Sequence, residues 1–211
     1  FWALSRGDYG WLTPALAAIH RDFAPDDLAP LIDRHGIGRT VLVQAAPTVA
    51  ETEYLLDLAA ATGRIAGVVG WVDFTAADAP ETIIRLAASG ALVGLRPMIQ
   101  DIADPDWMLG PSLTPAYEAL IAAGLAFDAL VLPHHLDRLS RLLARHPELR
   151  VVIDHGAKPR IRQGEIVTWA SGMARLAEET AAYCKLSGLV TEAGPGATAE
   201  TLRPYVDHLL A

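Results

Sequence analysis

Short apolar runs alternate with amphipathic stretches along almost the whole chain, and this alternation is the feature that most constrains the fold. Each run is rich in β-branched or other apolar residues, which is typical of a buried strand. A strand-then-helix order that repeats in this way predicts a parallel sheet covered by helices. The six predicted strands are Thr40–Ala45, Ile65–Asp73, Ala91–Met98, Leu125–Val131, Arg150–His155 and Tyr183–Leu189.

Helical patterns occupy the intervals, and several of them stop at a glycine, as at Gly36 and Gly63. This order predicts an α/β fold, an incomplete (β/α)8 TIM barrel with about six of its eight strands present; an open doubly wound sheet is the alternative. The predicted helices are Asp26–His35, Glu51–Thr62, Pro80–Ser89, Thr114–Ala123, Leu136–Arg145, Thr168–Glu179 and Glu200–Leu210.

One barrel domain, residues 1–211, is the simplest interpretation of this pattern. The chain starts at Phe1 without a methionine, and it ends at Ala211 in a helical pattern. We therefore expect a domain truncated at both termini, lacking one strand at each end. Its outer strands, near Thr40 and Tyr183, would then present exposed apolar edges.

Composition excludes several classes of protein. Apolar residues make up 52% of the 211 residues and charged residues 20%, so a large core is expected and global disorder is not. A net charge of −8 without a basic patch argues against nucleic acid or an anionic membrane as partner. No apolar run approaches the roughly 20 residues that span a bilayer.

The single cysteine, Cys184, excludes a disulfide framework and a cysteine-based zinc site within the chain, and it fits a cytoplasmic protein. We expect this thiol to face the helices as part of the core. The Gly194–Gly196 segment is a loop and not a phosphate cradle, so no nucleotide cofactor is expected. A homo-oligomer remains possible.

Polar residues fall at or near the carboxyl ends of the predicted strands, where barrel enzymes build their active sites. Side chains alternate between the two faces of a strand, and most of these residues lie opposite apolar neighbours. His155 shares a face with Val151 and Ile153. We expect Arg96, Asp128, His155 and Lys185 to point inward and to converge on one pocket. The whole set is Gln44, Trp71, Asp73, Arg96, Asp128, His155, Lys185 and Ser187.

Each of these residues also has a structural interpretation. Arg96 could form a salt bridge, and Asp128 would be costly to bury without a partner such as Arg96 or Lys185. His155 could cap its strand, and Asp154 is expected to cap the next loop or pair with a neighbour. Solvent or capping roles are expected for the remaining histidines, which are His20, His35, His134, His135, His146 and His208.

Several motifs together resemble one known family. Asp154–Pro159, D-H-G-A-K-P, is similar to the D-H-x-x-K-P stretch of the amidohydrolase-related (amidohydrolase 2) barrels. These include L-fuconolactonase- and L-rhamnonolactonase-type hydrolases and 2-pyrone-4,6-dicarboxylate lactonases. Cys184–Leu189 resembles the K-x-S-G-L strand of that family. Other segments of this chain resemble family segments in the same order along the sequence. They are Phe1–Trp2 followed by Tyr9–Leu12, then Val43–Ala45, and then Gly94–Pro97.

The resemblance implies a metal-dependent-hydrolase-like enzyme of carbohydrate catabolism that opens a cyclic ester, a sugar-acid or dicarboxylate lactone. His155, as a ligand of a divalent metal (zinc first) or with an H-x-H partner, would polarise the lactone carbonyl. Lys185, if the surrounding barrel lowers its pKa, would act as an acid or a hydrogen-bond donor. Asp128, which stands where many relatives have a histidine, is the third expected catalytic residue. Arg96 would grip the substrate. Other pocket-lining residues are Gln44, Trp71, Asp73 and Ser187.

The chain also departs from the family pattern. The H-x-H pair would precede Phe1, and the last-strand aspartate that activates water would follow Ala211, so the 211 residues alone are expected to be inactive. Two other functions stay open. One is a metal-dependent decarboxylase, a lyase on the same barrel, and the other is a truncated barrel without catalytic activity.

Overall fold

The structure is a computed structural model that describes residues 1–211. The chain packs into two compact units, Phe1–Arg96 and Pro97–Ala211. The single barrel domain expected from the sequence therefore stays a prediction.

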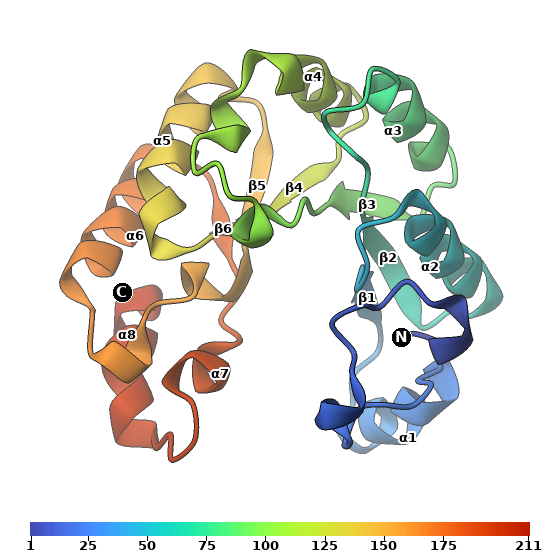
Figure 1. Cartoon of the computed structure of the whole chain (residues 1–211), viewed down its shortest axis with the longest axis horizontal. Coiled ribbons are helices and arrows are strands. Elements are labelled where there is room, and N and C mark those ends of the chain that lie inside the picture. The colour runs from blue at the N-terminus through green and yellow to red at the C-terminus, as the bar shows by residue number, and fades with distance from the viewer. The chain divides into compact units, whose positions relative to one another are not determined.

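The first unit places two helices along one side of three parallel strands, and Figure 1 shows α2 and α3 beside these strands. Val41 lies opposite Gly67 in the β1–β2 pair, and Val68 lies opposite Leu92 in the β2–β3 pair. The core between strands and helices contains Leu55, which is fully buried. Its elements are η1 (Leu4–Arg6), η2 (Pro14–Leu16), α1 (Pro25–Arg34), β1 (Thr40–Val43), α2 (Val49–Ala61), β2 (Ile65–Gly70), α3 (Ala79–Ala87) and β3 (Leu92–Leu95).

The second unit continues the same strand-then-helix order, with α4, α5 and α6 beside β4, β5 and β6 (Figure 1). Its longer elements are α4 (Thr114–Ala122), β4 (Ala126–Ala129), α5 (Leu136–Arg145), β5 (Arg150–Ile153), α6 (Val167–Glu179), β6 (Tyr183–Cys184), α7 (Leu189–Ala193) and α8 (Ala199–Leu210). Its short turns are η3 (Ile99–Asp101), η4 (Trp107–Leu109), η5 (Pro111–Leu113), η6 (Pro133–His135), η7 (Asp154–Ala157) and η8 (Ile161–Gln163).

The strands follow one another in chain order, β1-β2-β3-β4-β5-β6. A doubly wound sheet reverses its strand order at a switch point, so this order excludes that alternative. In the second unit Asp128 lies opposite Val152, and Val152 lies opposite Tyr183, all in parallel register. This register shows which residues of β4, β5 and β6 lie side by side in the sheet.

The two faces of β4 carry different side chains, although both faces are buried. Phe127 and Ala129 are wholly buried, and the Phe127 ring meets Tyr117 of α4 edge-on at 5.6 Å. Asp128 lies between them in the strand and so points to the opposite face. On the helix side, α5 repeats leucine at three- and four-residue spacing, and Leu136, Leu139 and others are buried as this amphipathic period predicts.

Every predicted strand lies where expected, but each is shorter at its carboxyl end than the apolar run suggested. The β6 strand shows this most clearly, because it ends at Cys184 and not at Leu189. The helix α7 and most of the short turns were not predicted, whereas η2 lies within the Asp8–Phe23 segment where a loop with a short helix is expected. The expectation that Cys184 is core was also wrong. The thiol is exposed, because β6 pairs with β5 alone and leaves its other edge open.

The outer strands expose apolar side chains, as predicted. Val41 of β1 is 50% exposed and Tyr183 of β6 is 74% exposed. No helix of the structure has both the length and the apolar character that a membrane crossing requires.

A buried carboxylate fastens the N-terminal segment to the first unit. Glu51, at the start of α2, is 0% exposed and accepts a hydrogen bond from the Tyr9 hydroxyl at 2.7 Å. The Arg6 guanidinium lies 3.6 Å from the same carboxylate oxygen, Oε2. The other oxygen, Oε1, accepts a hydrogen bond from the Ala45 amide at 3.2 Å. Burial and the bond to Glu51 raise the pKa of Tyr9, so its hydroxyl stays protonated as a donor. The loop thus lies over the end of β1.

His135 has the capping role expected for it, yet it is almost wholly buried. Its Nδ1 accepts a hydrogen bond from the Leu132 amide at 3.1 Å, which closes η6. The ring is 1% exposed and touches His134, with ring centroids 3.9 Å apart. Burial, followed by the charges of His134 and Arg138, lowers the pKa of His135 to about 4. The folded protein therefore holds this imidazole neutral.

We expect His135 to make the fold sensitive to mild acid. Its pKa is lowered in the folded chain and near 6.5 in the unfolded chain, so the unfolded state binds the extra proton first. The stabilisation is complete above pH 6.5 and is lost as pH falls toward 4. In denaturant unfolding, the free energy of unfolding of the wild type should fall by about 2 kcal/mol more between pH 7.5 and 4.5 than that of His135→Asn. In this variant the amide oxygen of asparagine replaces Nδ1 as the hydrogen-bond acceptor. Parallel pH curves for the two proteins would contradict this.

Candidate active site

A bridged pair of buried carboxylates lies at the carboxyl ends of the strands in the second unit. Asp128 of β4 and Asp154, just after β5, are 2% and 1% exposed. The Lys185 ammonium, just after β6, forms an ion pair with Asp128 and a second one with Asp154 at 2.6 Å. The predicted pairing of Asp128 with Lys185 is confirmed. Asp154, which sequence patterns marked only as a cap or paired residue, completes the bridge.

The charge state of Lys185 differs from the expectation. Burial alone would lower its pKa, but the hydrogen bonds and charges of Asp128 and Asp154 outweigh burial and raise the pKa of Lys185. The lowered pKa on which the expected role as an acid depended is therefore not found, because alternation along one strand does not reveal that two carboxylates meet the same amine. Lys185 is a permanent cation that can donate hydrogen bonds, and it is not a proton acceptor.

A left-handed turn follows β5 and carries His155. The φ angles of His155, Gly156, Ala157 and Lys158 are 53°, 59°, 57° and 50°. A left-handed conformation costs about 1–2 kcal/mol for each non-glycine residue, so a run of this kind needs external support. Backbone strain of this degree is concentrated at functional sites.

Three hydrogen bonds hold the turn, two of them to residues outside it. The Gly156 amide donates to the Lys185 carbonyl at 3.2 Å, and the Trp169 indole donates to the Gly156 carbonyl at 2.6 Å. Within the turn, the Lys158 amide donates to the His155 carbonyl at 2.9 Å. Strand alternation would carry His155 to the helix side, where Ile153 lies against α6 residues. The turn, and not alternation, therefore sets the direction of His155.

The His155 ring is oriented by the loop after β6. Its Nδ1 lies 2.8 Å from the Ser187 hydroxyl, which leaves Nε2 as the ring nitrogen not used in this pairing. Gly188 closes behind the ring with φ of 73°, and a Cβ there would lie 2.9 Å from both Cβ and Cγ of His155. Only glycine permits this approach. Ser187 thus belongs beside His155, as the sequence suggested.

Replacing Gly188 with alanine is expected to reduce activity by about tenfold or more. A methyl group at this position collides with the His155 side chain and also strains a left-handed backbone, so the ring must move. Steady-state kinetics should show the loss mainly in kcat. Gly90→Ala is the matched control, because Gly90 has φ of 73° but no atom within 4 Å of its missing Cβ. Equal losses in both variants would show that backbone strain alone acts.

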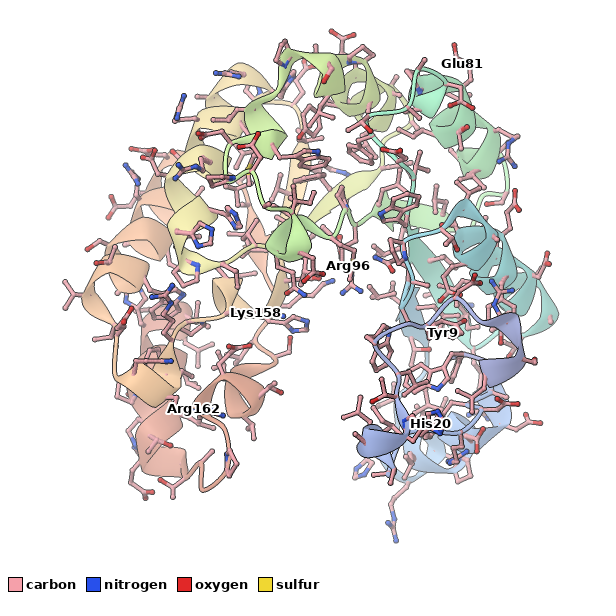
Figure 2. The ribbon with its side chains drawn as sticks, in the orientation of Figure 1. Tyr9, His20, Glu81, Arg96, Lys158 and Arg162 are labelled. Atoms are coloured by element: carbon pink, nitrogen blue, oxygen red, sulfur yellow. The ribbon has the colours of Figure 1, made fainter.

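In the first unit, Gln44 and Arg96 bind each other's backbone. The Gln44 side-chain amide donates to the Arg96 carbonyl at 3.0 Å, and the Arg96 guanidinium donates to the Gln44 carbonyl at 2.5 Å. The two residues follow β1 and β3, which flank β2, and Figure 2 labels Arg96 at the end of β3. These reciprocal bonds fix both polar side chains at the carboxyl end of the strands. Their substrate contacts stay predictions.

Trp71 and Asp73 lie in the segment after β2. The Thr52 hydroxyl bonds both the amide and the carbonyl of Trp71, at 2.7 and 2.8 Å, and the indole is half-buried. Asp73 is exposed, and its carboxylate accepts from the amide and hydroxyl of Thr75 at 2.9 and 2.6 Å. The observed contacts of Asp73 are those of a turn cap. Its predicted place in the pocket stays a prediction.

The structure thus brings together Asp128, Asp154 and Lys185 in one cluster, with His155 and Ser187 held by the adjoining loops. Convergence of Arg96 with these residues stays a prediction. No group of three or more His, Cys, Asp or Glu side chains is placed to hold a metal ion. The carboxylates of Asp128 and Asp154 are already paired with the Lys185 ammonium, and this positive charge repels a metal cation. These residues do not by themselves form the metal site expected around His155.

Comparison with known proteins places the chain in a family. Residues 5–211 match the family model described as Amidohydrolase, and the chain belongs to the amidohydrolase family. It is 50% identical, over 206 residues, to an L-fucono-1,5-lactonase of Burkholderia ambifaria. A second L-fucono-1,5-lactonase, from Burkholderia multivorans, is 33% identical over 199 residues. The alignments cover 98% and 92% of this chain, and 71% and 67% of the two relatives.

Solved structures confirm the fold. The crystal structure of an amidohydrolase from Burkholderia multivorans with bound zinc matches 100% of this chain and 76% of its own, with 34% identity and a TM-score of 0.90. Together with the strand order, this likeness confirms an incomplete (β/α)8 barrel with six parallel strands. The resemblance inferred from the D-H-G-A-K-P and K-L-S-G-L motifs is also confirmed.

Proposed function

We propose that the protein hydrolyses the ester bond of a sugar-acid lactone, with L-fucono-1,5-lactone as the first candidate substrate. The observation that carries the proposal is the 50% identity to an L-fucono-1,5-lactonase across 98% of the chain. The proposal includes a small-molecule substrate and a cytoplasmic location. Hydrolysis adds water to the lactone carbonyl, breaks the bond from that carbon to the ring oxygen, and leaves a hydroxy acid.

The geometry around His155 suits this reaction. The Ser187 hydroxyl lies 2.8 Å from His155 Nδ1 and Gly188 closes behind the ring, so the imidazole is held in place before it meets the carbonyl oxygen. A donor fixed in this way stabilises the negative oxygen that forms when water adds to the carbonyl. Lys185 contributes a permanent positive charge, held in place by Asp128 and Asp154. In the proposal His155 contacts the substrate, and Lys185 and Asp128 shape the local field.

The first unit would supply recognition. Arg96 presents a planar guanidinium and Gln44 an amide, and oxygen-rich ligands accept hydrogen bonds from both. Trp71, Asp73 and Ser187 remain the other proposed pocket residues. The water-activating base, which the resemblance assigns to an aspartate beyond Ala211, also remains part of the proposal.

A role for zinc stays a proposal with little support from these residues. A similar amidohydrolase crystallised with bound zinc. Here the side chains do not form a three-ligand group, and His155 Nδ1 is engaged with Ser187. His155 would be the ligand that this chain contributes. None of the steps above depends on a metal.

The decisive experiment uses the protein expressed from its complete gene. Purified protein should open L-fucono-1,5-lactone faster than the spontaneous reaction, with acid release followed by a pH indicator and the product checked by NMR. A kcat/KM near the usual enzymatic range of about 10⁴ M⁻¹s⁻¹ or more is expected. Release of CO₂ from aromatic acids without lactonase activity would favour the decarboxylase. Activity on neither substrate class would favour a barrel without catalytic function.

A further inference from the structure

The left-handed turn after β5 brings two side chains to the same side. Lys158 donates its amide to the His155 carbonyl, which is an i to i+3 bond, and the φ angles between them are those of a mirror-image 3-10 turn. Such a turn has three residues per repeat, so the side chains at positions i and i+3 are stacked above one another. His155 and Lys158 therefore project in the same direction.

Burial within the segment supports this arrangement. Asp154, Gly156, Ala157 and Pro159 are all buried, while His155 and Lys158 are each partly exposed. The strained turn therefore presents two side chains to solvent and hides the rest. The φ angles and the bond from the Lys158 amide to the His155 carbonyl are therefore consistent with two side chains that share one side of the turn. Figure 2 labels Lys158 on the loop after β5.

Lys158 has hydrogen-bonding capacity to spare. Its ammonium donates to the Gln100 side-chain oxygen at 2.5 Å, and no carboxylate lies within 4 Å of it. An ammonium group has three donors, so two remain after Gln100 is satisfied. Lys185, the other lysine of the chain, is instead held between two carboxylates. Lys158 is therefore the lysine that can bind an oxygen-rich ligand.

We propose that Lys158 is a substrate-binding residue, whose ammonium donates to a ring hydroxyl of the sugar lactone while His155 meets the carbonyl. The inference rests on the proposed lactonase function and extends it to the recognition of the sugar. Gln100 orients the ammonium without neutralising it. In this proposal the turn places His155, which meets the carbonyl, and Lys158, which contacts a hydroxyl, on the same side of the backbone.

The test compares two variants on two lactones. Lys158→Asn removes the ammonium but suits a left-handed backbone, and Gln100→Leu removes the partner but keeps the ammonium. The two substrates are L-fucono-1,5-lactone and δ-valerolactone, which has the same ring size and no hydroxyl groups. Lys158→Asn should lower kcat/KM for the sugar lactone about 10- to 100-fold, mainly through KM, and change that for δ-valerolactone less than threefold. Gln100→Leu should lower kcat/KM for the sugar lactone less than fivefold.

A binding measurement separates this inference from the proposed function. Titration calorimetry with 1,5-anhydro-L-fucitol, a ring with the hydroxyls but no carbonyl, should show at least tenfold weaker binding to Lys158→Asn than to wild type. If wild type opens neither lactone, the proposed function fails, while this titration still tests Lys158. Equal losses on both lactones, or a Gln100→Leu effect as large as that of Lys158→Asn, would overturn the inference. Lys158→Gln replaces the asparagine variant if that variant does not fold.

Discussion

Replacing His155 with alanine in the complete protein should lower kcat/KM for lactone hydrolysis by roughly two orders of magnitude or more. This is the usual size of the loss when a main electrostatic or acid–base group is removed. His155 is fixed by Ser187 and Gly188, so the wild-type imidazole is already in position before the substrate arrives. Alanine leaves the carbonyl without this donor. The melting temperature should change little, because the side chain of His155 is partly exposed.

Two further variants make this result specific. His155→Asn tolerates the left-handed backbone better than alanine does, so a similar loss in both excludes a distorted turn as the cause. His134→Ala removes an exposed histidine from η6, and it should change activity less than about twofold. Wild-type turnover in His155→Ala would leave the fold assignment intact and remove His155 from the mechanism.

Replacing Lys185 with methionine should destabilise the protein by about 3 kcal/mol, the lower end of the cost of breaking a buried ion pair, because the Lys185 side chain is itself 33% exposed. The change withdraws the ammonium from between two carboxylates that are 2% and 1% exposed, and methionine offers them no hydrogen bond. Denaturant unfolding at pH 7 measures the loss.

The chain provides its own control for this experiment, because Lys158 is its only other lysine. Lys158→Met removes an ammonium whose partner is the neutral Gln100, so about 1 kcal/mol or less should be lost. The double variant Asp128→Asn, Lys185→Met should recover part of the stability, since it removes one of the two carboxylate charges. Equal effects of the two single lysine replacements would show that the buried carboxylates do not depend on Lys185.

Local sequence patterns determined the order of elements and much of the second unit. Apolar runs and helix stops located all six strands and the seven longest helices, because a parallel sheet needs continuous apolar strands and each helix needs one apolar face. Alternation along Phe127, Asp128 and Ala129 put the carboxylate on the face away from the helices. The high cost of burying Asp128 alone suggested Arg96 or Lys185 as its partner, and the structure pairs it with Lys185.

Tertiary structure alone decided the details of the site. The turn from His155 to Lys158 adopts a backbone that only one of its four residues, Gly156, favours. A hydrogen bond from the Gly156 amide to the Lys185 carbonyl and one from the Trp169 indole to the Gly156 carbonyl hold it there. Neither partner is near in sequence, so no local pattern could reveal the turn. The raised pKa of Lys185 likewise depends on two carboxylates from different strands meeting at one amine. Propensity and alternation are properties of neighbouring residues, whereas backbone strain and charge coupling depend on residues that only the fold brings together.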